Sequence, residues 1–150
     1  MVGGSRLWPV ERFAEVARTL AAAGHRVLFT GSAKERPRAL AVADAAGLPE
    51  ETVAAGHLPL DRFAALIAGA SLVVSADTGA AHLASAYARP SVVLFGPAPP
   101  SEWGPPPGPH TVLTDASLRV GETFSPTPDP ALMAVTVEQV LAAAADHGIS

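Results

Sequence analysis

The chain of 150 residues contains no cysteine, which excludes disulfide bonds, thiolate chemistry and cysteine-ligated zinc sites. It has no basic run and a net charge of −4, so it lacks the positive surface that a nucleic-acid partner requires. No apolar stretch approaches the roughly 20 residues that span a bilayer, and no signal peptide follows Met1. We therefore expect no transmembrane segment. We expect a cytoplasmic protein, either free or peripheral at the inner face of the membrane.

Apolar residues at helical spacing alternate with short apolar runs along the whole chain. These patterns predict helices over residues 9–23, 35–46, 59–68, 79–88 and 137–147, and strands over 26–30, 52–55, 71–75, 90–95 and 111–113. The segment 97–109 is rich in proline and glycine, which predicts an ordered loop or a mobile lid, and 120–130 is predicted to be irregular. The alternation predicts a single α/β domain over residues 1–150, with a Rossmann-like parallel sheet and helices on both faces.

The start of the chain departs from this pattern, because a turn-like Gly3–Gly4 leads directly into a helix. A sheet of this type normally begins with a strand that is central and feeds such a turn. The first strand is therefore expected to be missing or truncated at Met1. Its loss would leave neighbouring strands unpaired, so we expect either that the sheet closes over the gap or that chains associate as a homo-oligomer.

The most informative segment lies where the strand over residues 71–75 gives way to a helix. Asp77, Thr78 and Gly79 form the turn, and His82 follows about one helical turn later. A helix start at the carboxyl end of a parallel strand offers unpaired N–H groups and a positive dipole end, which together bind phosphates. Gly79 allows a diphosphate to approach closely, Thr78 can donate a hydroxyl, and His82 can donate to phosphate. Asp77 could accept hydrogen bonds from sugar hydroxyls.

Each of these residues also has a purely structural interpretation. Asp77 could simply cap the helix, and His82 could be an ordinary helical residue. Trp8 is expected to be a core residue rather than a ligand contact. The triplet Asp-Thr-Gly also occurs in aspartic proteases. Those enzymes need an all-β context and a second aspartate, so the α/β pattern of this chain excludes an aspartic-protease interpretation.

Other candidates are expected at the same edge of the sheet. Gly31 and the pair Gly96–Pro97 follow strands, and Ser5 and Arg6 precede the first helix. Arg6 could clamp a phosphate through two hydrogen bonds, or it could be solvated.

Several segments together resemble the signature of glycosyltransferase family 9, which includes the lipopolysaccharide heptosyltransferases. The similar segments are 74–86, 89–90, 93–97 and 103–105, together with Arg6-x-Trp8-Pro9 and the entry to the final helix at 133–140. The resemblance implies the C-terminal half of a GT-B glycosyltransferase, the half that binds the nucleotide-sugar donor. It implies a donor site made of Asp77, Thr78, Gly79, His82, Arg6, Ser5, Gly31, Glu35, Gly96 and Pro97, with Arg6 in place of a lysine and Glu35 near the ribose.

The resemblance also implies a reaction: inverting transfer from a nucleotide-diphosphate sugar, similar to ADP-heptose, to a glycan or lipid acceptor. It implies no metal ion and no cofactor. The general base belongs to an N-terminal domain that these residues do not include, so no catalytic residue is expected here and the chain alone is expected to be incomplete. The loop over 124–130 lacks the cysteines that many members carry. A non-catalytic nucleotide-sugar-binding module and a nucleotide-sugar epimerase remain alternatives, whereas the missing Gly-x-Gly-x-x-Gly fingerprint disfavours a dehydrogenase.

Overall fold

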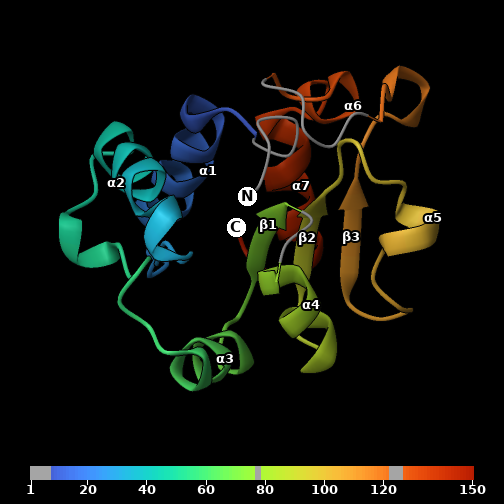
Figure 1. Cartoon of the computed structure of the whole chain (residues 1–150). Coiled ribbons are helices and arrows are strands. Elements are labelled where there is room, and N and C mark those ends of the chain that lie inside the picture. Colours follow the sequence, from blue (N-terminus) through green and yellow to red (C-terminus); the bar gives the residue numbers. More distant parts are fainter. Residues whose placement is uncertain (1–7, 77–78, 122–126) are drawn as a thin grey trace. The chain divides into compact units, whose positions relative to one another are not determined.

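The computed structural model describes residues 8–76, 79–121 and 127–150 (Figure 1). Contacts divide the chain into two compact units. The first contains residue 8 and residues 67–149, and the second contains residues 9–66 together with residue 150. Each unit is described by itself. The expectations for residues 1–7, a truncated first strand above all, lie outside the described residues and stay predictions, as does association of chains through that gap.

The first unit is built on a parallel sheet of three strands in the order β1–β2–β3. The strands are β1 (Val73–Ala76), β2 (Ser91–Leu94) and β3 (His110–Leu113). Ala76 pairs with Leu94 and Leu94 pairs with Leu113, so the three strands end together at one edge. Every residue of β2 is buried, as expected for a central parallel strand that is covered on both faces. The predicted parallel α/β fold is confirmed.

Helices cover the two faces of this sheet. Ala81 of α4 (Gly79–Ala86) packs with Val93 and Phe95 in one apolar cluster. The side chain of Thr111 points to the opposite face from Val112, and its hydroxyl lies 2.9 Å from Nε2 of His147, directly after α7 (Val137–Asp146). Figure 1 shows α4 in front of the sheet and α7 behind it. Thr136 caps α7, since its hydroxyl accepts from the Gln139 amide.

Trp8 belongs to the core of the first unit. Its side chain is fully buried, and its indole Nε1 donates to the carbonyl of Val135 at 3.1 Å. The hydrogen bond satisfies the one polar atom of a large apolar group, which is how buried indoles are usually accommodated. The prediction of a core role for Trp8 is confirmed.

The segment 97–109 is not wholly irregular, which corrects the sequence-based expectation. It contains a short helix, α5 (Pro100–Trp103), with Pro99 before it and Pro100 in its first turn. Proline is tolerated at that place because the N–H groups of the first turn have no partner within the helix. The prolines that predicted a loop therefore open this helix.

Regular structure also appears at the end of the segment predicted to be irregular. A 3-10 turn, η4 (Ala116–Leu118), precedes it, and α6 (Pro130–Met133) begins at its last residue. Asp129 caps α6, since its carboxylate accepts from the Ala131 amide at 3.0 Å. Residues 122–126 lie outside the described part.

The second unit is mostly helical. Its elements are α1 (Val10–Ala22), η2 (Ala33–Glu35), α2 (Arg36–Ala45), η3 (Glu50–Thr52) and the start of α3 (Leu60–Ala68). Ala14 and Ala17 of α1 pack against Val42 and Ala46. The strands predicted over 26–30 and 52–55 are reduced to one parallel bridge between Phe29 and Val53. The bridge is parallel, as predicted for the two strands. Thr52, the first residue of the segment 52–55, belongs instead to η3.

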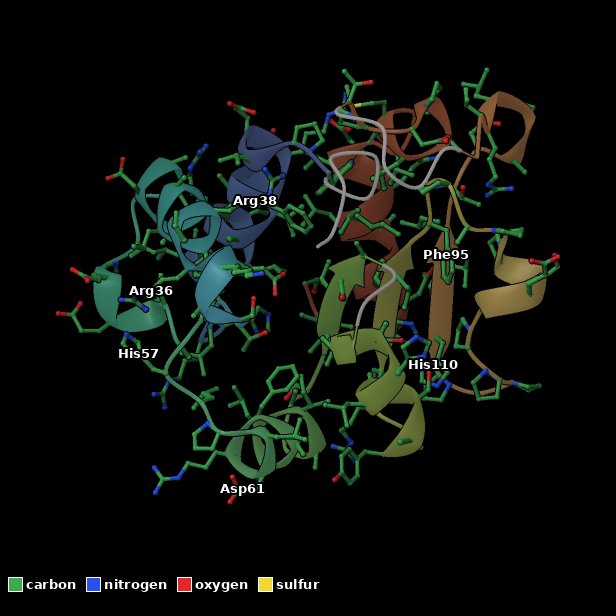
Figure 2. All side chains as sticks on the ribbon, viewed as in Figure 1. Arg36, Arg38, His57, Asp61, Phe95 and His110 are labelled. Atoms are coloured by element: carbon green, nitrogen blue, oxygen red, sulfur yellow. The ribbon has the colours of Figure 1, made fainter. Side chains whose placement is uncertain are left out.

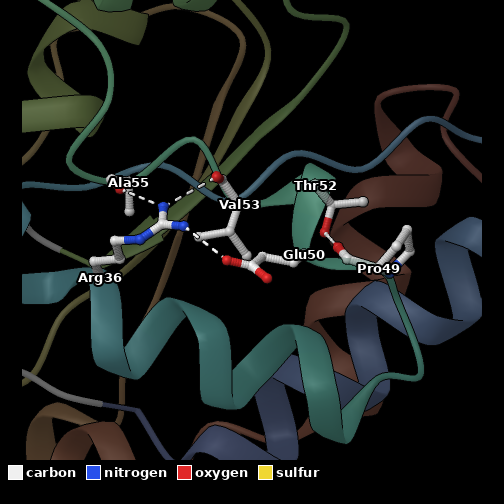
Figure 3. Close-up of polar contacts among 6 residues, drawn as sticks. All are labelled: Arg36, Pro49, Glu50, Thr52, Val53 and Ala55. Atoms are coloured by element: carbon white, nitrogen blue, oxygen red, sulfur yellow. Dashed lines mark hydrogen bonds and ion pairs between the residues drawn. The ribbon is translucent and has the colours of Figure 1, made fainter.

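Arg36 covers the outer side of this bridge (Figure 3). The amide of Ala54 bonds to Phe29, so the carbonyls of Val53 and Ala55 face away from it. Arg36 Nη1 donates to these two carbonyls at 3.3 and 2.9 Å, and Nη2 pairs with the Glu50 carboxylate at 3.4 Å. The guanidinium therefore satisfies backbone groups that would otherwise form an exposed edge.

Candidate functional site

The candidate site lies where β1 and β2 end side by side. Ala76 and Leu94 are paired as the last residues of the two strands, so the chain leaves both at the same edge. From β1 it passes through Asp77 and Thr78, which lie outside the described residues, into α4 at Gly79. From β2 it passes through Phe95 to Gly96. The structure thus brings Gly79 and Gly96 to one edge of the sheet, as predicted.

Gly79 stands beside open space. Apart from its chain neighbours and the backbone of its own helix, no atom of the described residues lies within 4 Å of a Cβ placed on it, and its backbone is outside the left-handed region. Among the described residues, neither packing nor backbone conformation therefore requires glycine at this position. Close approach of a ligand to the helix start is a reason that remains.

His82 lies at the end of the first turn of α4 and is exposed. It is therefore not a core histidine, and its exposure is compatible both with an ordinary helical residue and with a ligand contact. An exposed imidazole one turn from a helix start can reach an anion that is bound to the first amides of the same helix.

Gly96 and Pro97 are buried at the exit of β2, and a residue that the sequence did not single out holds this exit. Arg119 Nε donates to the Gly96 carbonyl at 2.8 Å, and its Nη2 donates to the Thr114 hydroxyl at 2.9 Å. Arg119 stands alone in a segment without periodicity, 23 residues from Gly96. Only the tertiary fold brings the two together, so no local signal could have found the contact.

The loop that carries Arg119 is organised by Asp129. The side chain of Asp129 is only 3% exposed, and its carboxylate accepts from the amides of Val120, Gly121 and Ala131 at 3.2, 2.9 and 3.0 Å. Backbone N–H groups compensate the buried charge. Asp129 therefore fixes the path of the chain immediately after Arg119.

Two predicted residues, Gly31 and Glu35, belong to the second unit. Gly31 has a φ of +152°, a conformation that favours glycine, and its carbonyl accepts from the Gly56 amide. Glu35 Oε1 accepts from the Ser32 amide at 2.9 Å in a capping box, while the residue is exposed. The structure thus gives Glu35 a structural task. A contact of Glu35 with a ribose stays a prediction.

The second unit also has an open hollow of about 300 Å³, lined by Arg36, Glu50, Glu51, Val53 and His57. Figure 2 labels two of these residues, Arg36 and His57. None of the residues predicted from the sequence lines this hollow. Its arginine is already bonded to Val53, Ala55 and Glu50, so its charge is not directed at a ligand.

Two further surveys cover the described residues only. No helix among them is both long and apolar enough to cross a bilayer. Within the same ranges, no three histidine, aspartate or glutamate side chains are grouped so that they could hold a metal ion.

Comparison with known proteins gives a consistent result. The profile of glycosyltransferase family 9 (heptosyltransferase) matches residues 4–122. Lipopolysaccharide heptosyltransferase 2 of Escherichia coli K12 is 34% identical over 101 residues, which are 65% of this chain and 29% of that protein. The structure of E. coli ADP-heptose lps heptosyltransferase II superposes with a TM-score of 0.83 at 28% identity, over 97% of this chain and 43% of that one.

A second solved structure, E. coli heptosyltransferase WaaC with ADP, matches with a TM-score of 0.70 at 28% identity, over 95% of this chain and 40% of that one. The matched part of the solved heptosyltransferases is their C-terminal part. The chain thus spans less than half the length of each of these relatives.

Proposed function

Because this chain belongs to glycosyltransferase family 9, the heptosyltransferase family, we propose that it forms the donor-binding domain of a glycosyltransferase. The proposed ligand is a nucleotide-diphosphate sugar, with ADP-heptose as the first candidate. Two similarities support this choice: a heptosyltransferase that holds ADP has the same fold, and the curated relatives are lipopolysaccharide heptosyltransferases.

One observation carries the proposal, namely the open space at Gly79, where α4 starts at the exit of β1. A diphosphate placed there would accept from the first amides of α4 and lie at the positive end of its dipole. In the proposed site Thr78 and His82 donate to the diphosphate, and Asp77 accepts from sugar hydroxyls. The remaining members are Arg6 and Ser5 at the phosphates, Gly96 and Pro97 at the next strand exit, and Gly31 and Glu35 at the nucleoside.

The proposed chemistry is inverting transfer without a metal ion. An acceptor oxygen attacks the anomeric carbon while the bond from that carbon to the diphosphate breaks, so negative charge develops on the departing phosphate. The start of α4, Arg6 and His82 would stabilise that charge, which is the largest contribution that binding groups can make in such a reaction. The base that takes the proton of the acceptor belongs to a second domain in this proposal.

Calorimetric titration of the chain with ADP, ADP-heptose and adenosine tests the binding site. We expect weak binding of the two diphosphates, since only one side of the proposed cleft is present. The double variant Asp77→Ala, His82→Ala should weaken ADP-heptose by at least about tenfold, because contacts to both the sugar and the diphosphate are lost. It should also weaken ADP, through the lost His82 contact to phosphate, and leave adenosine nearly unchanged. Asp61→Ala combined with His25→Ala is the matched control, because both of these residues lie in the second unit and outside the proposed site. Equal ADP binding by the site variant would overturn the proposal.

The need for a second domain is tested separately. Release of sugar from ADP-heptose and transfer to a glycan acceptor are followed with the chain alone and with the N-terminal half of a family 9 enzyme added. We expect binding without transfer by the chain alone, and transfer only with the added half. Transfer by the chain alone would contradict the proposed division of labour. The expected association of chains through the gap left by the first strand is a further prediction. Size-exclusion chromatography with light scattering tests it, and a stable monomer would count against it.

A further inference from the structure

Arg119 holds the exits of two strands at once. Its Nε donates to the carbonyl of Gly96, which follows β2, and its Nη2 donates to the hydroxyl of Thr114, which follows β3. The residue is half-buried, so its guanidinium is fixed in orientation rather than moving freely in solvent. Both acceptors follow strands at the carboxyl edge of the sheet, the edge where α4 also begins.

The charge of Arg119 has no acidic partner within the described part of the chain. The ion pair found there joins Arg36 and Glu50 in the second unit. Asp129, whose carboxylate binds the neighbouring Val120 amide, uses its oxygens on backbone amides. Among the described residues, no acceptor is bonded to Nη1 of Arg119. A partly desolvated cation without a counter-charge is unfavourable unless an anion completes the arrangement.

We propose that Arg119 binds an oxyanion of the donor's diphosphate through Nη1 while its Nε holds the Gly96 carbonyl. This inference rests on the proposed function and adds a residue to it. The cation would stand at the exits of β2 and β3, whereas the start of α4 stands at the exit of β1. Together they would hold the diphosphate from two sides. A guanidinium suits this task because it keeps its charge and forms several directed bonds at once.

The test compares three variants of the chain by calorimetry with ADP, inorganic phosphate and adenosine. Arg119→Met removes the charge and both bonds at similar length, Arg119→Lys keeps the charge, and Thr114→Val removes only the hydroxyl partner of Nη2. We expect Arg119→Met to weaken ADP about tenfold and to reduce the salt dependence of binding, as for a lost contact to phosphate. Arg119→Lys and Thr114→Val should stay within about threefold of the wild type, and adenosine binding should not change.

The outcomes separate this inference from the function on which it rests. If ADP binding falls in the Asp77, His82 variant but not in Arg119→Met, the assignment of Arg119 is wrong and the proposed site stands. If Arg119→Met weakens ADP and adenosine equally, its role is structural and the assignment is again wrong. A wild-type chain that binds neither ADP nor ADP-heptose overturns both. Melting temperatures of all variants establish that each is folded at the temperature of the titration.

Discussion

Nδ1 of His110 lies 2.7 Å from the hydroxyl of Ser91, whose side chain is completely excluded from water. The two residues are register partners at the first positions of β3 and β2, so the pair lies at the edge of the sheet opposite the candidate site. Burial lowers the pKa of His110, and nearby His147 lowers it further. Burial and His147 therefore favour a neutral imidazole at His110 in the folded chain.

This lowered pKa predicts a loss of stability in acid. The folded chain binds the His110 proton more weakly than the unfolded chain does, so the free energy of unfolding falls as pH drops below the ordinary histidine pKa of about 6.5, until the folded pKa is passed. Urea unfolding at pH 7.5, 6.5 and 5.5 measures the loss. The variant His110→Asn should lose less stability over this range than the wild type, and His147→Gln should fall between them. An identical pH dependence in His110→Asn would show that another group is responsible.

Replacement of Asp129 by asparagine is expected to destabilise the first unit by about 2–4 kcal/mol, because bonds to a buried charged acceptor are lost and amides are left unpaired. Denaturant unfolding measures this change. Asp115→Asn is the matched control, since Asp115 caps η4 through the single amide of Ser117, and its loss should cost about 1 kcal/mol or less. Similar losses in the two variants would contradict a special role for the buried carboxylate.

Ala88, directly after α4, has a φ of +51°, which is unfavourable for any residue with a Cβ. We expect Ala88→Gly to stabilise the chain by about 0.5 kcal/mol, because relief of this strain exceeds the extra entropy of glycine in the unfolded chain. Ala86→Gly, two residues earlier and within α4, should instead destabilise by about 1 kcal/mol. Thermal melts of the two variants should therefore shift in opposite directions, and a shift in the same direction would argue against strain at Ala88.

Arg36→Met should destabilise the second unit by about 1–3 kcal/mol, because the carbonyls of Val53 and Ala55 lose their donor. It should also promote association at high concentration, since an uncovered strand edge can pair with another chain. Unfolding curves and light scattering measure the two effects. Arg18→Met, which removes one bond to the Ala45 carbonyl at an exposed site, is the control and should change neither by much. If Arg36→Met has the same stability and the same degree of association as Arg18→Met, Arg36 does not protect the strand edge at Val53 and Ala55.

Where local signals are strong, the sequence predicted the structure well. The helix predicted over 137–147 depends on Thr136, whose cap is present, and the strand predicted over 90–95 is a continuous apolar run that becomes the fully buried β2. The prediction failed at Pro100, because proline is compatible with both a loop and a first helical turn. It also failed over 26–30, where an apolar segment forms only one bridge.

The candidate site shows a similar division. Gly79 could be placed from sequence because strand, turn and helix follow each other locally. Arg119 could not, because its contact with Gly96 joins residues that only the assembled sheet brings together. The side chain of Asp129 was missed for the same reason, although an aspartate followed by proline at a helix start was a local signal for its capping bond.

The bond from the Trp8 indole to the Val135 carbonyl joins positions 127 apart in the chain. During synthesis the indole therefore leaves the ribosome well before the residue that supplies its acceptor. The strands β1, β2 and β3 can pair in the order in which they emerge, yet the interior around Trp8 closes only afterwards. In a chain with Trp103 replaced by phenylalanine, so that Trp8 alone emits, a blue shift of tryptophan emission should therefore be among the last events of folding. A stalled chain ending before residue 135 should lack the hydrogen-bond partner of this side chain.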